Sequence, residues 1–262
     1  MYSMNRRRFL GHSAALVAGL PLGCSVRPSL ITELTLRPGG QRGQKELDWL
    51  SARFSFSFSK YRSSAYTRFR SLRVMNEDRI QPGGGFPMHG HKDMEIVTYV
   101  LDGALEHRDT LGNGAVIQPG TIQQMSAGSG IRHSEFNPLA TQTTHLYQLW
   151  FLPAAEGVQP GYAEADFPRR DGALRLIASG SGAAGSIRIN QDANLLAARL
   201  KKGQKVPFEQ IPGRGTWVQV CRGAIILNGQ RMLAGDGAHA EVAGRLELKA
   251  TEAAEILLFD LA

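Results

Sequence analysis

Cysteine and long hydrophobic runs are scarce in this sequence, and each scarcity excludes a class of protein. The 262 residues contain only 2 cysteines, which rules out a fold held by a disulfide framework, so the chain must rely on a packed core. No run reaches the ~18 apolar residues of a membrane-spanning helix. The hydrophobic fraction is 42% and the charged fraction 20%. This balance excludes an intrinsically disordered chain and suits one large or two small domains.

Acidic residues are absent from the first 30 positions, and this explains much of the net charge of +7. That stretch carries four arginines, which leaves 26 basic and 23 acidic residues in the remaining 232. A nucleic-acid interface would show clustered basic residues with aromatics between them. The chain offers only scattered arginines and the pair Lys201-Lys202. We therefore expect a solvated surface and no nucleic-acid partner.

The N-terminal segment has the order of features found in an export signal. The pair Arg6-Arg7 is followed by Phe9-Leu10 and then by a weakly apolar stretch from Ser13 to Gly23. A charged head before a short apolar segment is typical of a secretory signal. This segment resembles a twin-arginine signal, so we expect a periplasmic protein. A basic, frayed tail is the alternative.

The two cysteines have different expected roles. Leu22-Gly23-Cys24 resembles the end of a lipoprotein signal, although Pro21 departs from that pattern. Both a free periplasmic protein and one with a lipid anchor at Cys24 therefore stay open. Cys221 ends the strand-like segment from Trp217, so we expect a buried apolar thiol rather than a nucleophile.

From about Ile31 onward the hydrophobic pattern has a period of two, which predicts an all-β fold. Phe54, Phe56 and Phe58 alternate with serines and are predicted to share one face of an extended segment. Turn residues recur every eight to twelve positions, as in a sandwich or barrel. Asn228-Gly229 predicts a hairpin, and Gln191 to Leu200 could form a short helix. Strands are expected at 95–101, 104–110, 115–118, 121–126, 132–136, 145–152, 174–178, 186–190, 197–200, 217–221, 224–227, 246–250 and 256–259.

Composition divides the chain into two β-rich halves. Glycine, proline and charged residues dominate a stretch near 153–172 and indicate a linker. We therefore predict a signal segment at 1–30, an N-terminal metal-binding domain at 31–155, a linker at 156–172 and a C-terminal domain at 173–262.

Two short motifs in the first half carry the candidate chemistry. His89 and His91 are separated by one residue, and so are His133 and Glu135. In a strand, side chains two residues apart project from the same face, with Cβ atoms ~7 Å apart. If the two strands face each other across a barrel, three imidazoles and one carboxylate meet. Such a donor set suits iron, manganese, cobalt, nickel, copper or zinc.

The same motifs resemble those of known families. Gly83-x5-His89-x-His91-x3-Glu95 is similar to the first cupin motif, with Gly103 one position late. Gly130-x2-His133-x3-Asn137 is similar to the second, with Gly128 where many cupins have proline. More specifically, the segments Gly85–Glu95 and Met125–Glu135 look like the pirin family. The likeness extends from about Leu34 to Asp260 and covers nearly the whole chain after the signal.

The resemblance implies a bicupin made of two jelly-roll-like barrels, with metal only in the first. It implies one divalent transition metal, with iron placed first, held by His89, His91, His133 and Glu135. Cupins in general use a carboxylate at the position of Glu95, so Glu95 is the rival ligand. The second barrel is expected to be degenerate and empty, because a single histidine cannot hold a metal.

The remaining histidines of the two halves have structural interpretations. His107 lies in a returning strand and is expected to support the site rather than to bind the metal. His145 precedes an apolar strand and is expected to be a hydrogen-bonded core residue. His239 is the single histidine of the second half.

The resemblance implies a quercetinase-type dioxygenase that opens a flavonol-like phenolic with O2. In this interpretation Glu135 is also catalytic, because it accepts the proton of the 3-hydroxyl group. Phe86, Met88, Met94 and Met125 suit a flat aromatic ligand better than the polar substrate of a cupin isomerase. The main alternative is a non-catalytic metal-binding regulatory protein of the pirin type. We expect a monomer.

Overall fold

The computed structural model describes residues 29–167 and 171–262, and this part of the chain is built almost entirely from strands. The predicted export signal, including Arg6, Arg7 and Cys24, lies outside the described residues. Two short 3-10 helices, η1 (Gly39–Gln41) and η2 (Ala183–Gly185), are the helical elements described. No helix in these ranges has the length and apolar character needed to cross a membrane.

The N-terminal barrel consists of a seven-stranded sheet and a four-stranded sheet. The larger sheet has, in spatial order, β12 (Gly161–Asp166), β9 (Thr121–Ser126), β6 (Glu95–Asp102), β11 (Thr144–Phe151), β4 (Leu72–Ile80), β3 (Leu50–Phe54) and β2 (Gly43–Leu47). The smaller sheet has β5 (Gly85–His91), β10 (Ile131–Phe136), β7 (Leu105–Asp109) and β8 (Gly114–Ile117).

The C-terminal barrel repeats this arrangement. Its larger sheet has β1 (Thr35–Arg37), β20 (Gly237–Ala240), β17 (Gly215–Arg222), β22 (Ala254–Leu261), β15 (Ala193–Leu200), β13 (Arg175–Ser179) and β14 (Ile187–Arg188). Its smaller sheet has β16 (Lys205–Gln210), β21 (Gly244–Ala250), β18 (Ala224–Leu227) and β19 (Gln230–Leu233). The predicted all-β bicupin is therefore confirmed.

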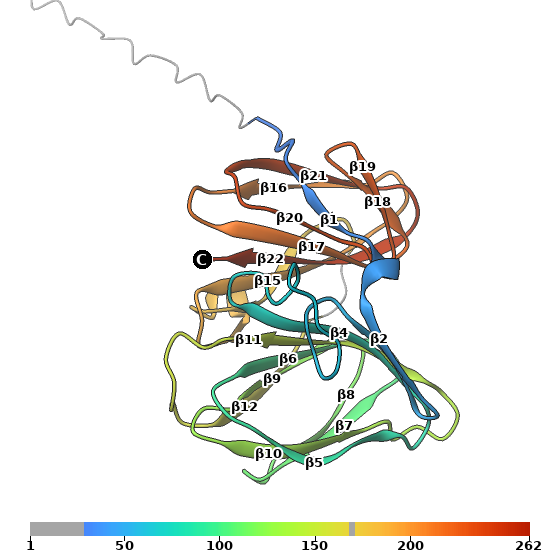
Figure 1. Ribbon diagram of the computed structural model, residues 1–262, viewed down its shortest axis with the longest axis vertical. Helices are drawn as coiled ribbons and strands as arrows, with labels where there is room; N and C mark the ends of the chain where they lie inside the picture. Colours follow the sequence, from blue (N-terminus) through green and yellow to red (C-terminus); the bar gives the residue numbers. More distant parts are fainter. Residues whose placement is uncertain (1–28, 168–170) are drawn as a thin grey trace, which may run out of the picture.

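The two larger sheets lie back to back in the middle of the molecule, and the smaller sheets form its outer layers (Figure 1). One hydrophobic cluster crosses this junction and includes residues of both barrels. Phe151 of β11 lies 6.1 Å from Phe259 of β22, and Phe56 lies 5.1 Å from Trp217 of β17, measured between ring centroids. Since the barrels share this core, we expect them to unfold together.

Two segments lie in a different place from the one that the sequence suggested. Leu36 of β1, assigned to the first domain, pairs with Ala238 of β20 in the second barrel. The predicted linker contains β12, which extends the first barrel's sheet by pairing with β9. In both cases backbone pairing satisfies an open sheet edge, which composition alone does not reveal.

Two local predictions were wrong. Gln191 to Leu200 is not a short helix, because Ala193–Leu200 forms β15, paired with β22 along its full length. The phenylalanines do not share a face either. Phe54 and Phe58 lie 5.2 Å apart at the first barrel, whereas Phe56 contacts Trp217 at the junction. Tertiary packing overrides local preference in both segments.

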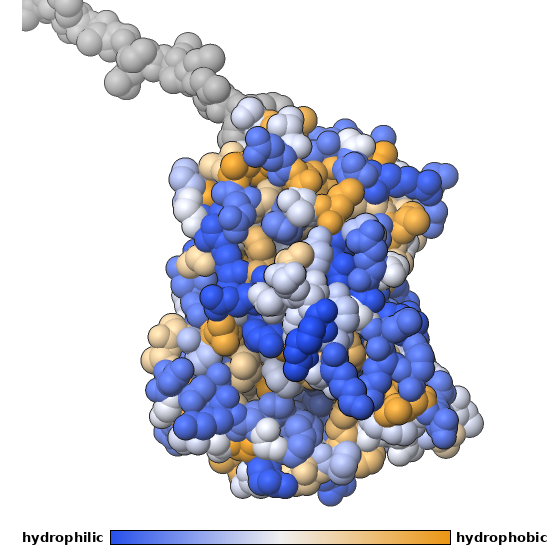
Figure 2. All heavy atoms as spheres, viewed as in Figure 1, coloured by the Kyte–Doolittle hydropathy of each residue, from blue (hydrophilic) through white to orange (hydrophobic). Residues whose placement is uncertain are grey.

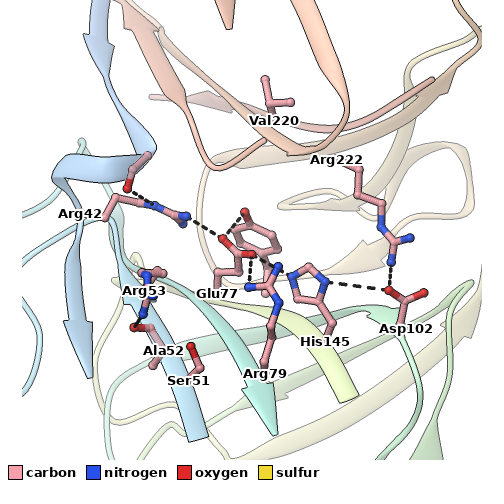
Figure 3. Close-up of polar contacts among 12 residues, drawn as sticks. Arg42, Ser51, Ala52, Arg53, Glu77, Arg79, Asp102, His145, Val220 and Arg222 are labelled. Atoms are coloured by element: carbon pink, nitrogen blue, oxygen red, sulfur yellow. Dashed lines mark hydrogen bonds and ion pairs between the residues drawn. The ribbon is translucent and has the colours of Figure 1, made fainter. Parts of the chain in front are cut away.

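A buried polar network also ties the barrels together (Figure 3). Arg42, directly before β2, donates to Glu77 of β4 at 2.7 Å, and His145 of β11 lies 2.9 Å from the same carboxylate. Burial would raise the pKa of Glu77, but the His145 contact and the Arg42 charge outweigh it and hold the pKa well below its usual range. Arg222 of β17 reaches across to Asp102 of β6.

The face of the molecule shown in Figure 2 is mainly polar with scattered apolar residues. Cys221 is a free, buried cysteine in β17, as predicted. Burial raises the pKa of its thiol well above the ordinary value. This thiol is accordingly a packing group and not a reactive one.

Candidate metal centre

The two histidine motifs come together in the first barrel, although not across it. β5 and β10 are neighbouring antiparallel strands of the four-stranded sheet, and His133 pairs directly with His89. The Nε2 atoms of these two residues are 3.0 Å apart. The ring centroid of His91 lies 4.8 Å from each of the other two. Direct strand pairing therefore gathers the three imidazoles at one point.

Hydrogen bonds on the far side of the rings fix which nitrogen faces the centre. His89 Nδ1 donates to the carbonyl oxygen of Pro87 at 2.9 Å. His107 Nε2 donates to Asp109 Oδ2 at 3.2 Å, which leaves His107 Nδ1 as an acceptor: Gln123 Nε2 donates to it at 2.9 Å, and His133 Nδ1 lies 3.4 Å from it. In the neutral rings, the Nε2 atoms of both His89 and His133 therefore carry lone pairs.

Two lone pairs that face each other repel unless a cation lies between them. Nitrogen ligands of one first-row ion lie about 3 to 4 Å apart, since each bond is about 2.0–2.1 Å. Burial lowers the pKa of His91 to about 4 and that of His133 to about 2, with neighbouring histidines adding to both shifts. The Nε2 atom of His91 is buried and has no hydrogen-bond partner in the described structure. These neutral nitrogens fit a transition-metal ion.

Glu135 lies beside the imidazoles and is held by one side chain. Gln148 of β11 donates from Nε2 to both carboxylate oxygens, at 2.7 and 2.6 Å, and Trp150 Nε1 donates to Gln148 Oε1 at 3.0 Å. The ligand atoms of Glu135, His133 and His107 all lie within 4.8 Å of one another. Burial raises the pKa of Glu135 to about 7, against the effect of the Gln148 bond. A bound cation would favour its ionised form.

The structure does not bring Glu95 into this cluster. Successive residues of β6 alternate between the barrel interior and the junction, and the Glu95 side chain points to the junction. Its carboxylate accepts hydrogen bonds from Gln124 at 2.8 Å and from Ser126 at 2.6 Å. Asn190 of the second barrel donates to it from the backbone and side-chain nitrogens, at 3.2 and 3.1 Å. These contacts give Glu95 a role in joining the barrels.

The other described histidines make structural contacts, as expected for His107, His145 and His239. His107 is fully buried behind His133, and Asp109 and Gln123 fix its orientation. His145 is bound to Glu77 in the junction network. His239 stacks on Trp217 with ring centroids 5.5 Å apart.

The candidate metal centre opens into a cavity of about 310 Å³. Phe86, Met88 and Trp150 contribute to its walls, together with His89, His91 and Glu135. Met125, which we expected at the mouth, is instead fully buried in a separate cluster with Ile96 and Ile131. Met94 lines a neighbouring cavity. The strand register decides this, because Met125 pairs with Ile96 on a stretch of sheet covered by other side chains.

Sequence reasoning missed a row of polar residues on the sheet behind the centre. Gln123, Thr98, Gln148 and Asn76 are consecutive cross-strand partners on β9, β6, β11 and β4. Directly paired residues point to the same side of a sheet. Each occupies an inward strand position, so a polar residue at a position of the apolar alternation was the available signal.

Comparisons with known proteins agree with this arrangement. Residues 36–151 match the family profile described as Pirin, and residues 176–261 match the one described as Quercetinase C-terminal cupin domain. The chain is 39% identical to the quercetin 2,3-dioxygenase of Escherichia coli K12, over 86% of this chain and 97% of that protein. It is also 39% identical to a pirin-like protein of Caulobacter vibrioides, over 86% and 98% of the two chains.

A solved structure supports the same relationship. The Escherichia coli bacterial pirin YhhW, in complex with nickel(II), superposes with a TM-score of 0.83 at 38% identity, over 87% of this chain and 99% of that one. Sequence similarity and fold agree over nearly the full length of these relatives. The chain belongs to the pirin family.

Proposed function

We propose that this protein is a metal-dependent dioxygenase of the quercetinase type, which opens a flavonol-like phenolic with O2. The observation that carries the proposal is the position of the histidine and glutamate cluster on the wall of a largely apolar cavity. Phe86 and Trp150 line this cavity, and their rings can pack against an aromatic ring of the substrate. Relatives named quercetin 2,3-dioxygenase support it.

The metal ligands in this proposal are His89, His91, His133 and Glu135. We place iron first among the divalent ions, with manganese, cobalt, nickel, copper and zinc as the other choices. When bound, such an ion polarises a phenolic oxygen and supplies the electronic means for reaction with O2.

The side chains of the chain itself position the substrate and move one proton. Glu135 accepts the proton of the flavonol 3-hydroxyl group, since its carboxylate shares the cavity with His89 and His91. Gln148 donates to both of its oxygens and keeps the carboxylate from rotating, and Trp150 holds Gln148 in turn. The apolar walls exclude water from the deprotonated ring.

Turnover of quercetin by metal-loaded protein tests the proposal. Each equivalent of quercetin should consume one equivalent of O2 and release carbon monoxide, and a chelator or His91→Ala should stop the reaction. Glu135→Gln should lower turnover by ~10²–10⁴-fold, because a carboxamide cannot accept the proton. Glu106→Gln is the matched control, since Glu106 lies on β7 of the same sheet and pairs with Arg108 near the surface.

Absence of both flavonol binding and O2 uptake across a panel of phenolics would contradict the dioxygenase. A non-catalytic metal-binding role would then take its place.

We also propose export to the periplasm by the twin-arginine route, on the order of residues from Arg6 to Gly23. Changing Arg6 and Arg7 to lysine should retain the protein in the cytoplasm, as measured by cell fractionation. Export of that variant at the normal level would exclude this route. Fatty-acid labelling at Cys24 distinguishes an anchored protein from a free one.

A further inference from the structure

The wall of the metal cavity contributed by β4 carries two acceptor atoms without partners. Along β4, Met75 and Glu77 face the junction between the barrels, whereas Asn76 and Asp78 line the cavity. Each of these two side chains is 4% exposed. The Oδ1 atoms of both are buried and make no hydrogen bond within the described residues. Buried acceptors of this kind normally have a partner.

Asp78 is the more unusual of the two because the residues paired with it across the sheet are apolar. Its cross-strand partners are Ala52 on β3 and Leu146 on β11, both part of a hydrophobic cluster. Burial, followed by the charges of Glu135 and Glu77, raises the pKa of Asp78 to about 7. The adjacent Glu77, in contrast, has Arg42 and His145 as partners. An unsatisfied carboxyl in an apolar wall is unfavourable for folding alone.

We infer that Asn76 and Asp78 form an acceptor pair that recognises a second hydroxyl group of a polyhydroxylated aromatic substrate, distinct from the hydroxyl that meets the metal. The inference rests on the proposed function and makes its substrate class narrower. A carboxyl keeps acceptor capacity in both its protonation states, and an amide oxygen always accepts. A phenolic hydroxyl is a donor that fits both atoms.

Charge and shape favour a neutral hydroxyl over an amine. Lys45 lines the same cavity and is close enough to act on Asp78 electrostatically. A cationic ligand would meet this ammonium group and the bound metal together. The cavity is also lined by Phe54, Phe58 and Phe86. These side chains favour a ligand whose hydroxyl group is carried on a planar aromatic ring.

The expected consequence is discrimination against flavonols without additional hydroxyl groups. Such a ligand leaves the buried acceptors unpaired and prevents water from reaching them. A hydrogen bond to a charged or buried acceptor changes affinity by roughly 10–100-fold.

The test is anaerobic binding to metal-loaded protein, measured by tryptophan fluorescence, to which Trp150 in the cavity wall contributes, and by calorimetry. The probes are quercetin, galangin and 3-hydroxyflavone, which share the 3-hydroxyl group and differ in the others. Wild-type protein should bind quercetin roughly 10–100-fold more tightly than 3-hydroxyflavone. Asp78→Leu should reduce this ratio to about 3-fold or less, with 3-hydroxyflavone bound at least as well as before. Galangin lacks hydroxyl groups on the pendant ring, so its affinity shows whether Asp78 binds a hydroxyl of that ring or of the fused rings.

Thr98→Val is the matched control. Thr98 lies on the same face of the same sheet and also has an unpartnered buried oxygen, but it does not line the cavity. The ratio of quercetin affinity to 3-hydroxyflavone affinity in Thr98→Val should equal that of the wild type.

Equal binding of quercetin and 3-hydroxyflavone by the wild type, or an unchanged ratio in folded Asp78→Leu, would overturn the acceptor pair. Neither result contradicts the proposed dioxygenase activity if O2 uptake persists. The wild-type comparison stands even if the variant does not fold. Failure of all three flavonols to bind would instead remove the proposed function itself.

Discussion

The two barrels have the same strand arrangement and opposite interiors. β16 and β21 occupy the place in the second barrel that β5 and β10 have in the first. Where the first barrel has His89 opposite His133, the second has Val206 opposite Leu248 and Phe208 opposite Leu246. Val206, Leu246 and Leu248 are buried in the hydrophobic cluster of the second barrel. The fold therefore permits a metal centre, and the inward side chains decide whether one is present.

The polar side chains of the first barrel are expected to make it less well packed and more dependent on a ligand than the second. Its interior has orphaned atoms on His91, Asn76, Asp78 and Thr98. The second barrel fills the corresponding space with aliphatic side chains. Mutations in the two barrels should accordingly affect different properties.

The largest effect should follow removal of a ligand, which makes the first barrel resemble the second. His133→Ala should eliminate most of the bound metal and reduce turnover to background, because the remaining donors no longer enclose the ion. Elemental analysis of the purified protein measures this, with about one ion per chain expected for the wild type. His239→Ala should leave the metal content unchanged, and loss of metal there would contradict the assignment of the site.

The next largest effect should come from the junction that holds the barrels together. Glu77→Gln should lower the free energy of unfolding by roughly 3–5 kcal/mol, because it leaves the buried Arg42 without its anion. Denaturant titration measures the change. Glu46→Gln, which removes an ion pair to Arg53 on the surface, should be indistinguishable from the wild type. Similar losses in both variants would show that burial is not the cause.

Opening a cavity in the second barrel should affect stability without touching the metal. Leu248→Ala should cost roughly 2–5 kcal/mol of unfolding free energy, from lost transfer energy and an unfilled cavity. The metal content of the folded variant should equal that of the wild type. Leu233→Ala, at a position 48% exposed, is the control and should change neither quantity. Metal loss in Leu248→Ala would mean that the two interiors are coupled.

A smaller effect should follow disturbance of the residues behind the ligands. In Asp109→Asn, the amide nitrogen can face His107 Nε2 and donate to it. The His107 proton then moves to Nδ1, where it repels the proton on His133 Nδ1. Metal affinity should fall roughly 10–100-fold, as for other residues that orient metal ligands. Competition with a chelator measures it. Asp166→Asn, near the surface of β12, is the control, and equal affinity in Asp109→Asn would refute the tautomer argument.

The smallest effect should be a dependence of stability on acid that originates at the junction. The pKa of Glu77 is depressed from 4.5 in the folded protein, so its contribution is present above about pH 4.5 and is lost as the pH falls below it. The loss is at most about 1.4 kcal/mol per pH unit. Unfolding of the wild type and Glu77→Gln should be compared between pH 3 and 6, where the difference should shrink with acid. A constant difference would exclude Glu77 as the group that titrates.

Several features of the protein could be predicted from residues alone. The period-two pattern predicted strands close to β6, β9, β17 and β18, and Asn228-Gly229 predicted the hairpin between β18 and β19. Spacing identified His89, His91 and His133, which the structure brings together, and Glu135, which lies in a group with His133 and His107. Cys221 is the one cysteine between residues 29 and 262, which excluded a disulfide within the described core. These features are local, so a short stretch of sequence contains all their causes.

Tertiary structure decided which face each residue occupies and what it meets there. Glu95 and Glu135 both lie in strands, but strand register turns Glu95 to the junction and Glu135 to the cavity, and no local pattern distinguishes the two. The same holds for Met125, for Asp78 with its apolar neighbours, and for β1 and β12, which extend sheets formed by distant strands. A shift of one residue exchanges the two faces of a strand. Only the long-range pairing of complete sheets fixes that choice.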